Sequence, residues 1–156
     1  MRKFFAIVVL GAILSFASVH ETKAQAFNKG TFLIEAGLGL NSFSGLYAAA
    51  EYGVTDKLGI GRIGVGASVG FPGFFSGGAY FGPEAYYHFD FAGLPKQLDL
   101  AAGLGLYFWT GYYSSLYTYV GFNAVGRWYF TDKIGVALHL GNTGGAGAAL
   151  GVVFKL

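Results

Sequence analysis

The chain has no cysteine and only three prolines, and 12% of its 156 residues are charged. A soluble domain typically carries about 25% charged residues, roughly twice as many. Without cysteine, the chain can form neither a disulfide framework nor a thiolate metal site. Its hydrophobic fraction of 54%, with 19% aromatic residues, excludes a disordered chain. The 27 glycines follow no three-residue period, which excludes collagen. Such a chain must bury apolar surface in something other than its own small core.

The N-terminal residues have the pattern of a secretory signal peptide. Arg2 and Lys3 precede an apolar run over 4–16, and Ala24-Gln25-Ala26 supplies the small-x-small cleavage pattern. The run is too short to span a bilayer, which takes roughly 20 residues of helix. We therefore expect a cleaved signal peptide over 1–26 and a single domain over 27–156. Cleavage after Ala24 and an uncleaved N-terminal anchor are the alternatives.

The excess positive charge belongs to this signal segment. It holds Arg2, Lys3 and Lys23 against Glu21, which equals the net charge of +2 of the whole chain. Residues 27–156 keep seven basic and seven acidic side chains. No basic patch remains that would attract nucleic acid, so we exclude nucleic acid as a partner.

The remaining sequence alternates between apolar and small or polar residues. No stretch after residue 26 has 18 consecutive apolar residues, which excludes transmembrane helices. In the first segment Phe32 and Ile34 alternate with Leu33 and Glu35, the period of a β-strand. The alternation predicts eight strands, over 31–40, 46–54, 63–71, 80–89, 98–108, 119–130, 134–140 and 147–156. Its phase is unclear over 58–62, where we expect a bulge or a slipped strand start.

The two faces of these strands differ in charge. One face has no charged residue, whereas the other carries most of the glycines together with Glu35, Glu51, Glu84, Asp99, Arg127 and Lys155. A membrane barrel turns its apolar face to lipid, and a soluble lipid-binding barrel does the opposite. The glycine-rich face has too little charge to be the exterior of a soluble protein. The sequence therefore predicts an all-β, eight-stranded antiparallel up-and-down transmembrane β-barrel, closed between its first and last strands.

The connections between the strands fall into two groups. Thr55-Asp56-Lys57 and Thr131-Asp132-Lys133 predict tight turns in which the aspartate caps backbone N–H groups. With residues 91–97 they would lie on the periplasmic side. The connections near 41–45, 72–78, 110–115 and 142–145 would face outside.

These features together resemble the small eight-stranded outer-membrane β-barrels of Gram-negative bacteria, the OmpX/OmpW-like, OmpA-transmembrane-domain-like and porin-like proteins. The last strand ends with Val152, Phe154 and Leu156 at period two, like the signal read by the barrel-assembly machinery, although that signal usually ends in Phe or Trp. Gly82-Pro83-Glu84-Ala85-Tyr86-Tyr87 resembles a strand of the porin-like family. The resemblance implies an outer-membrane location and, as partners, membrane lipids, lipopolysaccharide and the assembly machinery.

The charges of the inward face are the candidate functional residues. We expect a polar cluster in the lumen, made of Glu35, Glu51, Glu84, His88, Asp99, Arg127, His139 and Lys155. Asp99 should lie beside Arg127, with His88 one strand further, and Lys155 should close onto Glu35. The cluster could form a proton or ion path, but paired charges that fill the lumen are the simpler interpretation. Inward tyrosines alternate with glycines and would block a pore in a barrel this narrow: Tyr47, Tyr80, Tyr86, Tyr107, Tyr119 and Tyr129.

We expect no catalytic, cofactor-binding or metal site. Residues 27–156 contain only two histidines, His88 and His139, too few for a site of histidines alone. His139-Leu140-Gly141-Asn142 faintly resembles the His-x-Ser-Asn stretch of outer-membrane lipid A deacylases, but glycine replaces the serine nucleophile. Gly59-x-Gly61 and Gly64-x-Gly66 precede no helix and are not phosphate loops.

The function expected from the sequence is therefore a non-enzymatic one, a structural or surface role with a plugged polar lumen. The alternative is a small transporter or ligand-binding barrel for hydrophobic compounds, with Phe74, Phe75, Tyr112 and Tyr113 as entry contacts. A lipid A-modifying enzyme is a more distant alternative.

Overall fold

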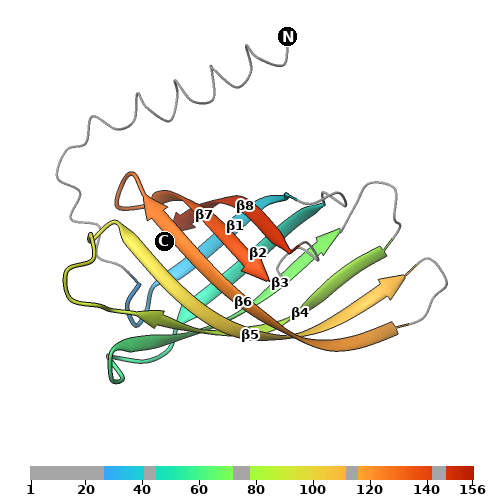
Figure 1. Cartoon of the computed structure of the whole chain (residues 1–156), viewed down its shortest axis with the longest axis horizontal. Helices are drawn as coiled ribbons and strands as arrows, with labels where there is room; N and C mark the ends of the chain where they lie inside the picture. Colours follow the sequence, from blue (N-terminus) through green and yellow to red (C-terminus); the bar gives the residue numbers. More distant parts are fainter. Residues whose placement is uncertain (1–26, 41–44, 72–77, 112–115, 142–146) are drawn as a thin grey trace, which may run out of the picture.

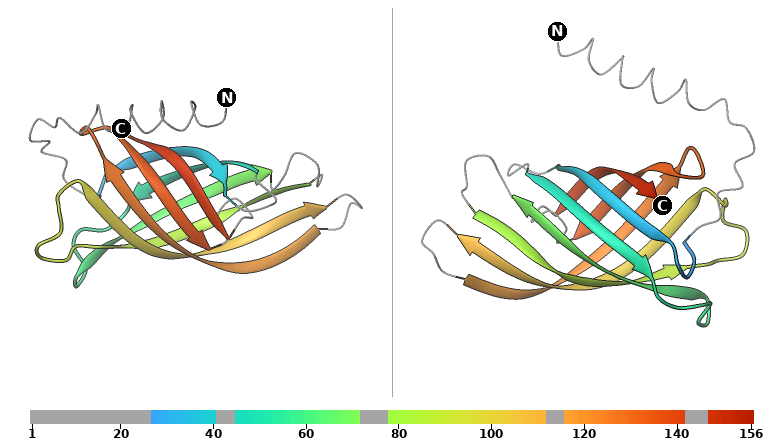
Figure 2. Two further views of the ribbon diagram at one scale, coloured as in Figure 1. Left: turned by 45° about the horizontal axis from the view of Figure 1, so that its top comes forward. Right: turned by 180° about the vertical axis from the view of Figure 1, so that it is seen from behind.

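The computed structural model describes residues 27–40, 45–71, 78–111, 116–141 and 147–156. These residues form a closed barrel in which each strand pairs with the next and β1 pairs with β8, all antiparallel (Figure 1; Figure 2). The strands are β1 Phe32–Gly39, β2 Leu46–Gly53, β3 Gly61–Phe71, β4 Gly78–Phe89, β5 Leu98–Gly111, β6 Leu116–Tyr129, β7 Ile134–Gly141 and β8 Ala148–Lys155. The expected all-β, eight-stranded antiparallel barrel is confirmed. None of the described residues forms a helix long and apolar enough to cross a membrane.

Two ends of the barrel can be distinguished. We call the turn end the one that holds the connections over 54–60, 90–97 and 130–133 together with Phe27 and Leu156. The opposite end, which we call the loop end, holds the four connections that we expected to face outside. Most of their residues lie outside the described part of the chain, as does the expected signal peptide over 1–26.

The uncertain phase near residues 58–62 has a simple structural cause. The β3–β4 pairing runs without interruption from Gly61 opposite Phe89 to Gly70 opposite Tyr80, so β3 contains no bulge. Before it, Leu58 pairs back with Gly61 in a small turn, with Gly59 in the left-handed conformation at a φ of 64°. The expected tight turn over residues 55–57 is therefore wrong, because the β2–β3 connection is seven residues long, 54–60.

Threonine hydroxyls accept hydrogen bonds at both Thr-Asp-Lys sequences. The Thr131 hydroxyl accepts hydrogen bonds from the backbone N–H groups of Lys133, at 3.2 Å, and Ile134, at 2.9 Å. The Thr55 hydroxyl accepts one from Ile63 at 2.8 Å. Threonine thus takes a capping role that the sequence assigned to aspartate, while Asp56 forms an ion pair with Lys29.

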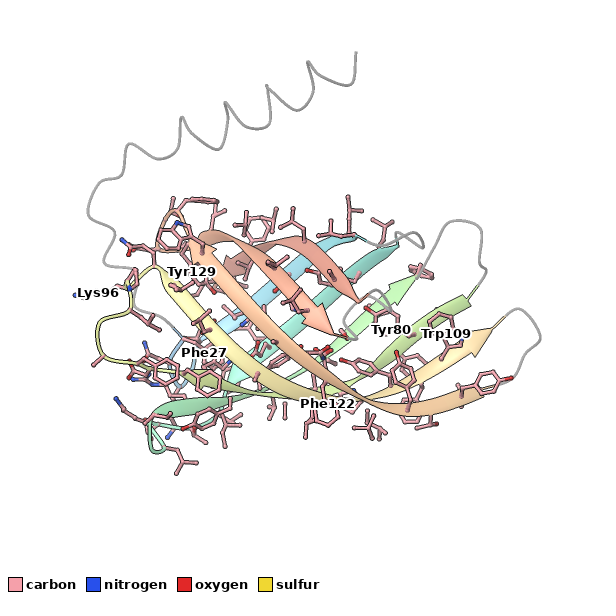
Figure 3. All side chains as sticks on the ribbon, viewed as in Figure 1. Phe27, Tyr80, Lys96, Trp109, Phe122 and Tyr129 are labelled. Carbon is pink, nitrogen blue, oxygen red and sulfur yellow. The ribbon has the colours of Figure 1, made fainter. Side chains whose placement is uncertain are left out.

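The strands turn apolar side chains outward and polar ones inward, as expected (Figure 3). On β1, Phe32 and Ile34 are exposed, whereas Leu33 and Glu35 are buried. The same alternation continues around the barrel, because successive side chains of a strand point to opposite faces. Large apolar side chains exposed on the outside include Leu38, Val65, Val69, Phe81, Leu104, Val120, Phe122, Leu138, Leu150, Val152 and Phe154.

Inside the barrel, tyrosines face glycines across neighbouring strands. Four inward tyrosines each have a glycine as direct pairing partner: Tyr47 with Gly37, Tyr80 with Gly70, Tyr86 with Gly103 and Tyr129 with Gly135. The missing side chain leaves room for the ring, as at Gly70, where an added Cβ would lie 2.3 Å from the Tyr80 Cε1 atom. The buried hydrophobic side chains of the described residues form three clusters: Tyr47–Tyr80–Tyr107–Ala149, Phe27–Leu33–Tyr129–Val153 and Tyr86–Ala101–Val125–Ala137.

The loop end of the barrel is uneven in height. β5 and β6 are 14 residues long, whereas β1, β2, β7 and β8 have eight residues each. The β6–β7 pairing stops at Asn123 opposite Gly141, so residues 116–122 of β6 project beyond β7 (Figure 1). Phe122 in this projection is 72% exposed and is labelled in Figure 3.

Candidate functional site in the barrel lumen

The centre of the lumen is a buried arginine that contacts three carboxylates. Arg127, on β6, donates through Nη2 to Glu51 Oε2 at 2.8 Å, through Nη1 to Asp99 Oδ2 at 3.2 Å and through Nε to Glu35 Oε2 at 3.3 Å. All four side chains are almost completely buried. Asp99 lies directly opposite Arg127 in the β5–β6 pairing, as predicted, while Glu35 and Glu51 reach it from β1 and β2.

His88 joins two of these carboxylates. Its Nδ1 atom lies 2.8 Å from Asp99 Oδ1, and its Nε2 atom contacts Glu51 Oε1. A neutral imidazole has one N–H group and one lone pair, so it can donate to only one of two carboxylates. The contacts at both nitrogens therefore require one more proton, held on the ring or on a carboxyl group.

Glu35 has further partners on the other side of the lumen. It accepts a hydrogen bond from the Tyr47 hydroxyl and contacts Nε2 of His139 on β7. The Nδ1 atom of His139 is buried and has no hydrogen-bond partner among the described residues. Arg127, Glu35, Glu51, Asp99, His88 and His139 thus form one connected network, which we call the arginine cluster.

Glu84 and Lys155, the other two predicted members, lie apart from these contacts. Glu84 accepts hydrogen bonds from Ser68 at 2.8 Å, from Tyr86 at 3.3 Å and from Tyr107. Lys155 lies opposite Leu33 rather than Glu35, whose pairing partner is Val153. The Lys155 ammonium lies 5.1 Å from the centre of the Tyr129 ring. The expected closure of Lys155 onto Glu35 thus misplaces it by two residues along β1.

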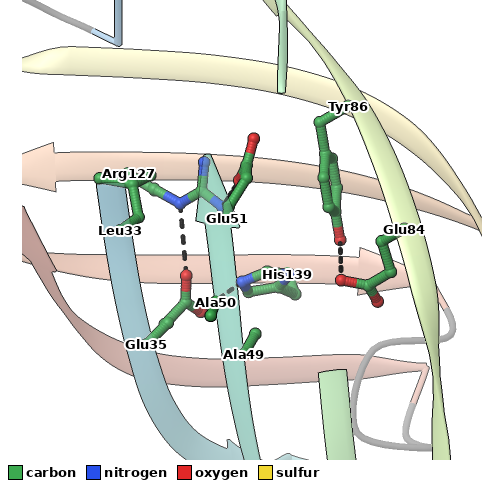
Figure 4. Close-up of a pocket in the computed structure, with 9 residues that line it drawn as sticks. All are labelled: Leu33, Glu35, Ala49, Ala50, Glu51, Glu84, Tyr86, Arg127 and His139. Carbon is green, nitrogen blue, oxygen red and sulfur yellow. Dashed lines mark hydrogen bonds and ion pairs between the residues drawn. The ribbon is translucent and has the colours of Figure 1, made fainter. Parts of the chain in front are cut away.

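Little space remains between these side chains. A cavity of about 10 Å³ lies among Leu33, Glu35, Ala49, Ala50, Glu51, Glu84, Tyr86, Arg127 and His139 (Figure 4). This volume holds about one water molecule. Among the described residues, no group of three or more histidines and carboxylates is arranged to hold a metal ion. Chemically, the site can hold charges and protons in fixed positions.

Sequence reasoning missed one residue at the edge of this cluster. Phe27 entered it only as the first residue after the expected cleavage point, yet it is 2% exposed. Its ring stacks on the His88 imidazole, with centroids 3.6 Å apart and planes 7° from parallel. The alternation of β1 could not have indicated it, because Phe27 precedes the strand and the turn at Gly30.

A second group of charges lies at the rim of the turn end. Asp90 accepts hydrogen bonds from Lys57 at 3.0 Å and Arg62 at 3.2 Å, and these cations lower the pKa of its carboxyl group. In the same way, Lys29 lowers the pKa of Asp56, and Asp56 raises the pKa of Lys29. These exposed ion pairs connect the N-terminal segment with the 54–60 connection, and that connection with Asp90 of the 90–97 connection.

The Asp90 pair predicts a small, pH-dependent contribution to stability. A carboxyl group whose pKa is lowered by folding stabilises the fold above its ordinary value of 3.8 and loses this effect as the pH falls through the lowered value. We expect Asp90→Asn to reduce the free energy of unfolding by about 0.5 kcal/mol at pH 7. In urea titrations, the difference from the parent should disappear under strongly acidic conditions. A difference that persists there would contradict the ion-pair explanation.

The fold defines the class of this protein as a small closed antiparallel β-barrel. Two solved structures are similar to it. The N-terminal β-barrel domain of Pseudomonas aeruginosa OprF has a TM-score of 0.64 and 20% sequence identity, covering 83% of this chain and all of that one. A de novo designed transmembrane β-barrel has a TM-score of 0.62 and 11% identity, covering 85% of this chain and all of the design.

At these identities the likeness shows the fold alone. It agrees with the small eight-stranded barrel class expected from the sequence and does not distinguish the OmpX/OmpW-like group within it. No protein-family model matches the sequence, and no curated protein matches it.

Proposed function

We propose that this protein is an integral outer-membrane β-barrel with a structural or surface role and no catalytic activity. The observation that carries the proposal is the inverted distribution of polarity. Glu35, Glu51, Asp99 and Arg127 are buried inside the barrel, while large apolar side chains cover its outside. A soluble protein with this surface would expose far more apolar area than water tolerates. In a bilayer the same surface is favourable, and the closed sheet leaves no strand edge between β1 and β8.

The filled lumen supports a non-conducting barrel. The arginine cluster and the tyrosine–glycine pairs occupy the interior, and the cavity between them has a volume of only about 10 Å³. Transport of hydrophobic compounds through the lumen is therefore the weaker candidate. Its proposed entry residues, Phe74, Phe75, Tyr112 and Tyr113, lie outside the described residues.

One contact and one residue type support the proposed absence of catalysis. The hydroxyl of Ser68 donates to Glu84, an acceptor that holds hydrogen bonds from two tyrosines as well. Position 141, where the lipid A deacylase pattern has its serine, is a glycine beside His139 and Leu140. The proposed partners are outer-membrane lipids, lipopolysaccharide and, during insertion, the barrel-assembly machinery.

Gel mobility of the membrane fraction tests the proposed function. We expect the unheated protein to migrate differently in SDS from the boiled protein, because a closed barrel embedded in lipid resists SDS until it is heated. It should be found in the outer-membrane fraction, with the mass of residues 27–156. A soluble protein whose mobility is unaffected by heating would contradict the proposal and would make the lumen a candidate lipid-binding cavity.

A further inference from the structure

The N-terminal segment 27–31 folds back into the barrel at the turn end. Thr31 N–H donates to the Asn28 carbonyl at 3.0 Å, and Asn28 N–H donates to the Thr31 hydroxyl at 3.1 Å, which closes a turn. Gly30, at a φ of 84°, allows this reversal. Hydrogen bonds from Gly30 N–H to the Gly53 carbonyl and from Gly53 N–H to the Thr31 carbonyl, both 2.9 Å, attach the segment to β2.

The end of this turn places Phe27 inside the mouth of the barrel. The ring packs with Leu33, Tyr129 and Val153 and covers one face of His88. Figure 3 labels Phe27 and Tyr129. His88 itself bridges Glu51 and Asp99 of the arginine cluster. Phe27, itself only 2% exposed, therefore covers the His88 side of the arginine cluster at the turn end.

Two glycines on the barrel wall make room for this segment. A Cβ at Gly53 would lie 2.1 Å from the Asn28 carbonyl oxygen and 3.2 Å from the Phe27 ring. A Cβ at Gly64 would lie 2.8 Å from the Phe27 ring. A Cβ at Gly53 would collide with the backbone of Asn28, and this contact can be relieved only by moving that backbone. A side chain at Gly53 is therefore incompatible with the inserted segment.

We propose that Phe27 is a stopper that closes the turn end of the lumen and keeps water away from the arginine cluster. When segment 27–31 leaves, water and small cations gain access to the lumen, where Glu35, Glu51, Glu84 and Asp99 are buried on the inward face. The barrel of the proposed function would then open and close at its turn end through segment 27–31. This inference rests on the proposed function.

Cysteine labelling tests the stopper directly, because the chain has no cysteine of its own. Ala101 is buried on the inward face of β5, opposite His88. In the folded A101C barrel, a charged thiosulfonate reagent should react slowly. Adding F27A should accelerate the reaction at least about tenfold. Removing the buried ring weakens the packing that holds segment 27–31 in place, and each loss of about 1.4 kcal/mol shifts the equilibrium between the inserted and the open segment tenfold.

Two further variants make the result specific. Phe32→Ala removes the same ring from the outer face of the neighbouring strand β1, so it should leave the labelling rate unchanged. Gly53→Ala keeps Phe27 but expels the segment that holds it, so it should accelerate labelling as F27A does. If F27A does not fold, G53A decides the question. Ala137→Cys, opposite Arg127, is a second buried reporter, used where A101C does not fold.

The outcomes separate this inference from the proposed function. Faster labelling in F27A and G53A but not in F32A supports the stopper, and a small cation-selective conductance of F27A in a planar bilayer would extend it. Equal labelling rates in F27A and F32A, in barrels that keep their heat-dependent gel shift, overturn the stopper alone. A parent chain without that shift overturns the proposed function instead.

Discussion

Replacing Arg127 with methionine should destabilise the barrel by about 3–5 kcal/mol, because it leaves buried carboxylates without their cation. The guanidinium is the common partner of Glu35, Glu51 and Asp99, at 2.8–3.3 Å. His88 and His139 contact the same carboxylates but come from other strands and cannot replace a donor that reaches all three. The measurement is the free energy of unfolding in urea, with the heat-dependent gel shift as a check on folding.

The matched control is Arg62→Met at the rim of the turn end. Arg62 donates to Asp90 at 3.2 Å, but Asp90 is 43% exposed in its side chain. An ion pair in contact with water contributes about 0–1 kcal/mol. If R127M and R62M lose equal amounts of unfolding free energy, the arginine cluster contributes no more to stability than an exposed ion pair does.

A second substitution should recover part of the loss. Glu51→Gln removes the charge that lies nearest to Arg127, with 2.8 Å between Nη2 and Oε2. The double variant R127M/E51Q should therefore lose less than the two single variants added together, by about 0.5–3 kcal/mol. Arg127→Lys should fall between R127M and the parent, because an ammonium group lacks the planar fork that reaches several carboxylates.

The strands were predictable from the sequence because each has one apolar outer face and one lumen face, and this alternation is a local property of the sequence. The Asp99–Arg127 contact was predictable too, since neighbouring antiparallel strands pair residue by residue. The contacts across the lumen were not predictable from the sequence. Arg127 meets Glu35 and Glu51 from strands that are not its neighbours, at a height set by strand tilt and stagger. No local pattern encodes that stagger.

The same limitation explains the misplaced Lys155. The sequence predicts that β8 closes on β1, but the register of that pairing has to be known to the residue. The observed register sets Lys155 opposite Leu33, two residues from Glu35 on the same face. Phe27 was missed for another reason, because it lies outside any strand and reaches the lumen through a turn at Gly30.

Gly70→Ala should cost about 1–3 kcal/mol, the usual effect of overpacking a closely packed interior. The added Cβ would lie 2.3 Å from Cε1 and 2.6 Å from Cζ of Tyr80, directly across the β3–β4 pairing. Tyr80 is completely buried, and its ring packs edge-on against Tyr107 with centroids 5.8 Å apart. The ring thus has no free space into which it can retreat. Urea unfolding in the same lipid or detergent measures the loss.

Gly126→Ala is the control for this substitution, since both change a strand glycine to alanine. The Cβ at Gly126 would have Leu100 Cδ2 as its nearest neighbour, at an ordinary 3.5 Å. Because glycine weakens a strand through its backbone entropy, G126A should be neutral or slightly stabilising. In G70A, replacing Tyr80 with leucine should relieve the contact, so G70A/Y80L should lose less than the sum of its parts. Equal effects of G70A and G126A would mean that the tyrosine–glycine fit does not limit packing in the lumen.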